Sequence, residues 1–165
     1  MRMVKQKGVA AIEFTIMLPV LLLMLFATAE IGRAIYQYSH LTRMVRDASR
    51  YLSVTAIPDT SGSLAASFDD NCDLGDDCNL DCKNCISETK DLLVYGKVGG
   101  TVPLLYGLST SDVIISGSPA TSIVTVSVDY NWHPLFSDRI SGFGIGDGID
   151  LSFNFSVSHA MRAGL

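Results

Sequence analysis

Glu13 is the residue whose position in this sequence most needs a chemical explanation. It lies in a stretch from Val9 to Ala29 that has no other charged side chain. An ionised carboxylate in hydrocarbon costs at least ~2.5 kcal/mol, so a charge placed there is expected to have a function. Gly8 stands five residues earlier, directly before the apolar stretch. The glycine and the carboxylate are therefore the first candidate functional residues.

A second group of residues that could do chemistry consists of four cysteines between residues 69 and 85: Cys72, Cys78, Cys82 and Cys85. In an exported chain the default is two disulfides, and four cysteines allow three connectivities, among which the sequence does not choose. A zinc site is the alternative, but the spacing lacks the paired C-x2-C knuckles of common structural sites. The C-x2-C pair at the end has redox-motif spacing without the surrounding βαβ pattern. Disulfides are therefore predicted.

The same loop is rich in carboxylates, which are calcium ligands. An EF-hand pattern begins at Asp69, but its glycine comes one place late, at Gly75, and its twelfth residue is Leu80 in place of glutamate. The loop is therefore not an EF-hand, and a solvated acidic loop without metal is predicted. An irregular calcium site remains the alternative, with the candidate ligands Asp69, Asp73, Asp76, Asp77 and Asp81.

Enzyme chemistry finds little support in the sequence. Neither a G-x-S-x-G nor an H-E-x-x-H motif is present. His40, His133 and His159 are each expected to be structural, and the glycines between residues 142 and 148 do not fit a phosphate-binding pattern. We predict a protein that is not an enzyme and has no cofactor.

The apolar stretch from Val9 to Ala29 is long enough, at about 1.5 Å per helical residue, to cross a bilayer. Cations before it favour a cytoplasmic N-terminus and an exported remainder: Arg2, Lys5 and Lys7. Cations after it weaken that inference: Arg33, Arg43, Arg46 and Arg50. The net charge is −5, which gives no support for nucleic-acid binding.

The helical pattern continues beyond the apolar stretch. Apolar residues recur at steps of three and four through Ile31, Ile35, Tyr38, Leu41, Val45, Ala48 and Leu52. This pattern predicts one helix from about Val9 to about Thr55, half in membrane and half packed on a domain. The alternative is a secretory signal peptide cleaved after Ala27-Thr28-Ala29, which would cut this helix in the middle.

Such a helix, preceded by Lys7-Gly8 and beginning Val9-Ala10-Ala11-Ile12-Glu13-Phe14, resembles the type IV pilin superfamily. Further segments make the chain similar to the TadE-like pseudopilins of the tight-adherence (Flp) pilus system. These segments are Leu18–Leu22, Asp47–Tyr51, Leu92–Gly96, Val124–Tyr130 with Pro134, and Leu151–His159. The resemblance covers nearly the whole chain, and the acidic cysteine loop departs from it.

The resemblance implies how the N-terminal residues act. A prepilin peptidase would cut after Gly8 and make Val9 the first mature residue. Glu13 would then pair with the new amine, within the subunit or on its neighbour. The implied partners are other pilin and pseudopilin subunits, the peptidase and the inner-membrane assembly platform. The implied location is the inner membrane in a single pass, with the C-terminal domain periplasmic, and then the pilus or the cell exterior.

The exported part, residues 57–165, is predicted to be α+β. Ser87 is expected to cap a short helix that runs through Tyr95 and ends at Gly96. Strands are expected at 113–115, 124–130 and 149–157, forming a small antiparallel sheet. The apolar stripe of residues 35–52 would cover one face of this sheet. The domain organisation is thus a leader at 1–8, a membrane half at 9–29, an amphipathic half at 30–56 and a globular domain at 57–165.

Together these features predict a minor pilin or pseudopilin that primes assembly of a tight-adherence pilus or forms its tip. A minor role is expected because the family's major pilins are much shorter. The alternative is a periplasmic binding domain, released after Ala29 or held by an uncut anchor. The N-terminal residue of the mature protein separates these predictions.

Overall fold

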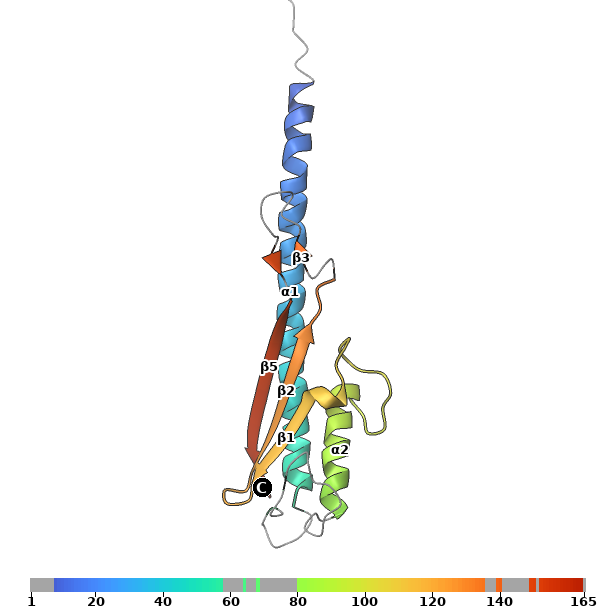
Figure 1. The fold of residues 1–165 in the computed structure, drawn as a ribbon, viewed down its shortest axis with the longest axis vertical. Helices are drawn as coiled ribbons and strands as arrows, with labels where there is room; N and C mark the ends of the chain where they lie inside the picture. Colours follow the sequence, from blue (N-terminus) through green and yellow to red (C-terminus); the bar gives the residue numbers. More distant parts are fainter. Residues whose placement is uncertain are drawn as a thin grey trace, which may run out of the picture. The chain divides into compact units, whose positions relative to one another are not determined.

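A computed structural model of the chain describes residues 8–57, 64, 68, 80–135, 139–140, 149–150 and 152–164. It separates into two compact units, residues 1–36 and residues 37–165. One helix, α1, contributes to both units and spans Val9–Thr55 (Figure 1). Its bounds confirm the long helix predicted from the apolar pattern, which continues past Ala29 without a break.

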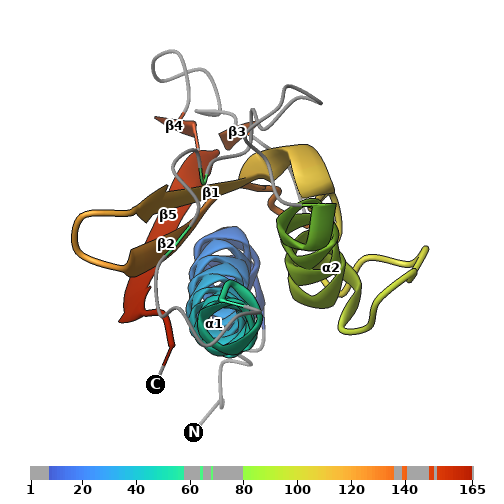
Figure 2. The same ribbon diagram turned by 90° about the horizontal axis from the view of Figure 1, so that it is seen from below.

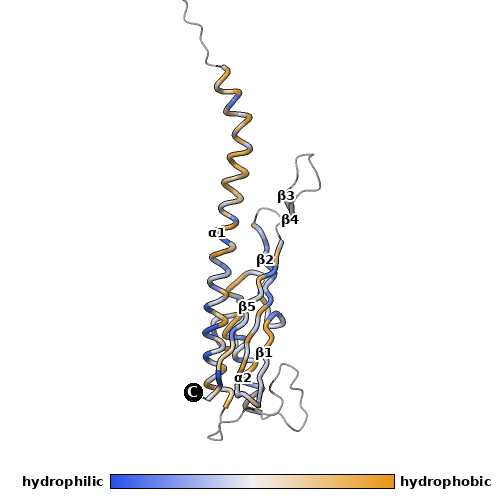
Figure 3. The backbone as a smooth tube through the Cα atoms, turned by 90° about the vertical axis from the view of Figure 1, so that its left-hand side faces the viewer, coloured by the Kyte–Doolittle hydropathy of each residue, from blue (hydrophilic) through white to orange (hydrophobic). Residues whose placement is uncertain are grey.

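In the first unit, α1 carries an almost unbroken apolar surface (Figure 3). The large apolar side chains from Val9 to Phe26 are exposed. Pro19 lies inside the helix and donates no backbone hydrogen bond there. At the end of this stretch Arg33 Nε donates to Glu30 Oε2 at 3.2 Å, and Glu30 is 7% exposed. The first charges after the apolar stretch are therefore paired with each other.

The second unit places the C-terminal half of α1 between a sheet and a second helix (Figure 2). The sheet has the order β1-β2-β5, with β1 spanning Val113–Ser118, β2 Ile123–Trp132 and β5 Phe153–Arg162, and every pair is antiparallel. A short 3-10 helix, η1 (Thr110–Asp112), leads into β1. A separate two-stranded ladder pairs β3 (Arg139–Ile140) with β4 (Ile149–Asp150). This is the α+β architecture predicted from the sequence.

The core of the second unit lies where the helix stripe meets the inner face of the sheet. Leu41, Val45, Ala48 and Leu52 of α1 are fully buried, as are Val124, Val126 and Val128 of β2. Burying a side chain of this size contributes about 1.5–3 kcal/mol. The upper part of the predicted stripe is not buried, since Ile35 is 64% exposed and Tyr38 is 45% exposed. The β2–β5 ladder ends at the Trp132–Phe153 pair, and the Tyr38 ring contacts Phe155, two residues from that end.

The second helix, α2 (Leu80–Tyr95), begins seven residues before Ser87, so the predicted cap at Ser87 is wrong. Ser87 lies inside the helix, where its hydroxyl donates to the Asn84 carbonyl at 3.0 Å. The predicted end is right: Gly96 adopts φ +73° and its N–H donates to the Leu92 carbonyl.

The strands differ from their predicted limits in two ways. β1 and β2 are longer than expected, because cross-strand pairing extends to Ser118 and to Trp132. The expected strand 149–157 is divided between β4 and β5, and Phe153, expected on the buried face, is 44% exposed. Phe153 belongs to the last residue pair of the β2–β5 ladder, opposite Trp132, so no further pair of this ladder lies beyond it.

Candidate functional site

The predicted processing residues lie together at the start of α1. Val9 is the first helical residue, and the Gly8 carbonyl accepts a hydrogen bond from the Ile12 N–H at 3.3 Å. A Cβ added at Gly8 would meet nothing within 4 Å. Among the described residues, therefore, neither packing nor a left-handed backbone requires a glycine there, whereas a peptidase that accepts only small residues would.

Glu13 is exposed and lies four residues after Val9. On an α-helix this spacing puts the two residues on one face, about 5–6 Å apart between Cβ atoms. A free amine on Val9 would thus lie within reach of the Glu13 carboxylate of its own chain.

The apolar surface around this pair has no cover within the described chain. Of the helices that the structure describes, α1 is the one long and apolar enough to cross a membrane. Exposed apolar surface on this scale marks a membrane or protein contact. The helix therefore fits a membrane anchor.

The cysteine loop lies mostly outside the described residues. Cys72, Cys78 and the aspartates Asp69, Asp73, Asp76 and Asp77 are not described, and Cys82 and Asp81 are described only as backbone of α2. Cys85 is buried on α2, at 4% exposure. No group of three metal-ligating side chains occurs among the described residues. Both the disulfide prediction and the calcium alternative stay predictions.

Close to Cys85, a polar contact joins the two helices of the second unit. The Tyr51 hydroxyl on α1 donates to Glu88 Oε2 on α2 at 2.7 Å. This hydrogen bond to the carboxylate, helped by burial and by the negative charge of Glu88, raises the pKa of Tyr51. This contact could not be predicted, because no sequence pattern indicates that two residues 37 positions apart lie side by side.

His159 was expected at a strand end, but it lies inside β5, three residues before Arg162, on the expected face toward α1. Its Nδ1 is 2.9 Å from the hydroxyl of Ser49, a residue of α1 that is fully buried. Because that hydroxyl donates to the Arg46 carbonyl, it accepts the proton of Nδ1–H. His133 makes an edge contact with the Tyr106 ring.

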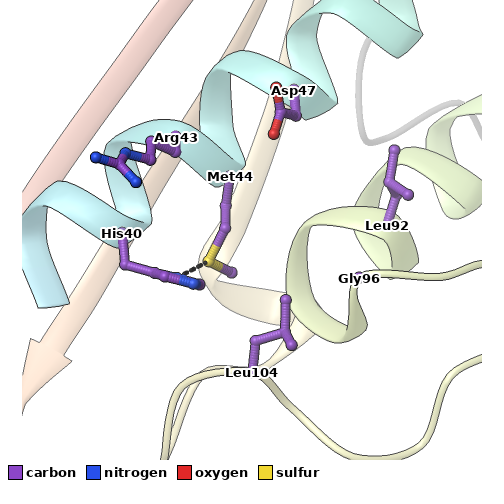
Figure 4. Close-up of a pocket in the computed structure, with 7 residues that line it drawn as sticks. All are labelled: His40, Arg43, Met44, Asp47, Leu92, Gly96 and Leu104. Carbon is purple, nitrogen blue, oxygen red and sulfur yellow. Dashed lines mark hydrogen bonds between the residues drawn. The ribbon is translucent and has the colours of Figure 1, made fainter.

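A shallow groove of about 350 Å³ opens between α1 and the end of α2. Met44, Leu92 and Leu104 converge on it, and His40 Nδ1 approaches the Met44 sulfur at 2.9 Å (Figure 4). The lining also includes the charged residues Arg43 and Asp47 of α1.

The fold and the anchor together define a class: an α+β protein of the pilin type, whose N-terminal helix is apolar first and amphipathic afterwards. Residues 8–50, about a quarter of the chain, match the model of the family described as TadE-like protein. This match supports the resemblance of the N-terminal helix to TadE-like proteins of the tight-adherence pilus system. Neither curated proteins nor solved structures give a match.

The likeness to this family suggests a coarse role in the pilus system. TadE-like pilus proteins are structural, and their system implies other pilus components as partners. The match covers Gly8, Val9 and Glu13 and stops at Arg50, so it includes neither α2 nor the sheet.

Proposed function

We propose that this chain is a minor pilin or pseudopilin that takes part in building a tight-adherence pilus, as a priming or tip subunit. The observation that carries the proposal is the start of α1. A glycine without a packing role immediately precedes the helix, and a carboxylate follows one turn later within the family match.

In this proposal the chain is first held in the inner membrane by residues 9–29, with its N-terminus cytoplasmic and its globular domain in the periplasm. A prepilin peptidase cuts between Gly8 and Val9. The cut removes Arg2, Lys5 and Lys7, which hold the N-terminus on the cytoplasmic side. It also creates the amine that partners Glu13.

Assembly then transfers α1 from lipid to a bundle of similar helices. The apolar side chains that no described residue covers would pack against those of other subunits. In an apolar surrounding an unpaired carboxylate or amine is costly, so each Glu13 needs an amine in the correct register. The charge pair would thus set the position of one subunit against the next.

The size of the folded part supports a minor role. The second unit has its own core and a sheet, whereas the resemblance implies major pilins much shorter than this chain. A priming or tip subunit can carry such a domain without having to repeat it along the fibre.

The N-terminal residue of the mature protein tests this proposal most directly. Mass spectrometry of the protein purified from membranes should find Val9 at the N-terminus. A chain that starts at Glu30 has lost its anchor to signal peptidase, and one that starts at Met1 is a plain membrane anchor. Either result would refute the pilin proposal.

A further inference from the structure

The last strand of the sheet, β5, has a long open edge. It lies at the end of the order β1-β2-β5, on the side of the sheet away from α2 (Figure 2). It pairs with β2 over ten residues in one unbroken register, from Phe153 opposite Trp132 to Arg162 opposite Ile123. Among the described strands, β2 is its one partner. On the other side of β5, a row of backbone N–H and C=O groups therefore faces no strand of the described chain.

The register identifies the residues that direct these backbone groups outward. The Ala163 N–H donates to the Ser122 carbonyl at 2.8 Å, and bonded and non-bonded pairs alternate along an antiparallel ladder. The odd-numbered residues of β5 therefore bond to β2, and the even-numbered residues point their N–H and C=O groups away from it. We call these even-numbered residues the β5 edge. Their side chains are all exposed and none is acidic: Asn154, Ser156, Ser158, Ala160 and Arg162.

The two edges of the sheet differ in how they are protected. Natural sheets protect an open edge with Pro, Lys, a bulge or a short strand, because unpaired backbone groups bind any extended chain. At the other edge, β1 has only six residues, and its Gly117 N–H donates to the Phe68 carbonyl at 2.8 Å. By contrast, β5 has ten residues in an unbroken ladder and contains neither Pro nor Lys. β5 therefore has the properties of a strand that pairs on both sides.

A positive charge lies beside the β5 edge on the helix. The Ser49 hydroxyl of α1 is 2.9 Å from His159 Nδ1, and Arg46 lies one helical turn before Ser49. On α1 the buried stripe from Leu41 to Leu52 lies on one side of Ser49, and Arg46 lies exposed on the other. Arg46 makes no ion pair within the described residues. A strand added to β5 would pass beside Arg46 and would gain from a carboxylate facing it.

The direction of β5 argues against a second copy of this chain as the source of the added strand. The Tyr38 ring contacts Phe155, and the Gly164 N–H donates to the Ser53 carbonyl, so β5 runs in the same direction as α1. Antiparallel pairing is the more stable kind, and two copies joined in this way through β5 would have oppositely directed α1 helices. Copies anchored in one membrane by residues 9–29 have the same direction. The geometry therefore favours a strand from a different protein.

We propose that the β5 edge binds an extended strand of a different pilus subunit, which adds to the sheet in the antiparallel sense and places a carboxylate toward Arg46. In such strand addition, main-chain hydrogen bonds give affinity and alternate side chains give specificity. This inference rests on the proposed pilin function and deepens it, because it names the surface that joins this minor subunit to a neighbour. One added strand occupies the edge completely, as a single priming or tip complex requires.

The test uses the tagged full-length chain, expressed together with the other pilin and pseudopilin subunits of its system and purified from membranes in detergent. Each of the other subunits carries a second tag. Ser158→Pro removes one outward N–H and leaves the ladder with β2 in place, so co-purification with one of these subunits should fall about five- to tenfold. The matched control is Ser158→Ala, which keeps the N–H and should bind as wild type does.

The charge beside the edge is tested in the same assay. Arg46→Glu should weaken the association about threefold, because an exposed ion pair becomes repulsive. Lys97→Glu makes the same charge change at an exposed residue outside α1 and the sheet, and it should leave co-purification unchanged. Equal weakening by both variants would contradict a carboxylate placed toward Arg46.

Amide hydrogen exchange of the wild-type protein gives a second readout, which needs no variant to fold. The Ser156 and Ser158 amides should exchange quickly in the protein purified alone and about tenfold more slowly in the complex. The Val157 and His159 amides already bond to β2 and should change little.

Several results would refute the proposal: unprotected Ser156 and Ser158 amides in every complex, or protection of both in the protein purified alone, which indicates a second copy. Equal co-purification of wild type and Ser158→Pro would do so as well, as would equal losses in Ser158→Pro and Ser158→Ala. These outcomes are separable from the pilin proposal, because the mature N-terminus is read on the same samples. Val9 at the N-terminus together with unprotected amides refutes only the strand addition.

Discussion

At the scale of single residues, the informative positions are those whose identity the fold does not explain. Gly8 has open space around the position of a Cβ, and Glu13 lies exposed in an apolar helix. By contrast, Gly117 and Gly96 are explained by close packing and by a positive φ angle. Residues whose type is not explained by packing are therefore the candidates for a role in assembly.

Substitution at Gly8 should separate cleavage from folding. Gly8→Phe should leave a full-length, membrane-bound precursor, because a bulky side chain blocks access of a peptidase to the scissile bond. Gly8→Ala is the control and should still be cut to a large extent, since nothing in the described chain collides with its methyl group. Immunoblotting of membranes distinguishes precursor from mature chain. Wild-type trimming of Gly8→Phe would contradict the prepilin interpretation.

Tyr51 allows a prediction about pH. Because its pKa is raised in the folded chain, its contribution to stability is complete below pH 10 and is lost as pH rises through the folded pKa. Tyr51→Phe should cost about 1 kcal/mol at neutral pH and should flatten the loss of stability above pH 10. Denaturant unfolding of the full-length protein in detergent at several pH values measures both effects. Tyr95→Phe is a control that leaves the Glu88 contact intact; an equal flattening in that variant would contradict the prediction.

At the scale of elements, much of the fold could be predicted because periodicity is strong where burial is one-sided. The stripe from Leu41 to Leu52 and the alternation in β2 are direct consequences of packing on one face. The start of α2 was missed because Leu80–Ile86 is rich in Asp, Asn and Cys, a composition typical of loops. The helix forms there nonetheless, because Cys85 and Ile86 face the core and bury one side of this polar segment.

The β1 strand contains a close approach that sequence alone does not reveal. Gly117 N–H donates to the Phe68 carbonyl, and a Cβ on Gly117 would lie 2.6 Å from the Phe68 ring. Gly117→Ala should therefore destabilise the second unit by about 1–3 kcal/mol. In a Phe68→Ala background the same change should cost much less, which a double-mutant cycle of unfolding free energies measures. Equal costs in both backgrounds would show that the ring is not the obstacle.

The predicted disulfides belong to this scale as well. Closing loops of this size contributes about 2–4 kcal/mol in favourable cases. Mass spectrometry of the exported protein without reductant should therefore find no free thiol at Cys72, Cys78, Cys82 or Cys85. Reduction should lower the thermal midpoint of the domain. Four free thiols, or one bound zinc ion per chain, would contradict the prediction.

At the scale of the whole molecule, the helix α1 belongs to two compact units. Its apolar side chains are exposed in the first unit, and one of its faces is buried in the second. The family match covers this helix from its start to Arg50, whereas α2 and the sheet lie beyond it. The N-terminal site stays a prediction, which rests on a short motif within the family match. The contacts Tyr51–Glu88 and Ser49–His159 could not be predicted, since they depend on how distant elements pack.

Glu13 should matter for assembly more than for membrane insertion. Removing an unpaired carboxylate lowers the cost of the span by about 2.5 kcal/mol or more, so Glu13→Ala should insert at least as readily as wild type. In the assembled fibre the amine of Val9 would then lack its counter-charge, and a buried amine without a partner is costly. Pilus formation, or co-purification with other pilins, should therefore be lost while mature protein accumulates in the membrane.

Two measurements on the same strains separate these steps: microscopy counts pili, and blotting of membrane fractions gives the level of mature protein. Ile12→Ala, a neighbouring change that leaves the charge pair intact, is the control and should assemble. Glu13→Gln keeps the shape and removes the charge, so it should fail as Glu13→Ala does. Processing after Gly8 should persist in all three variants, because the cut is made at the glycine. Normal pili with Glu13→Ala, in a strain where deletion of the whole protein abolishes them, would show that the carboxylate has no role in assembly.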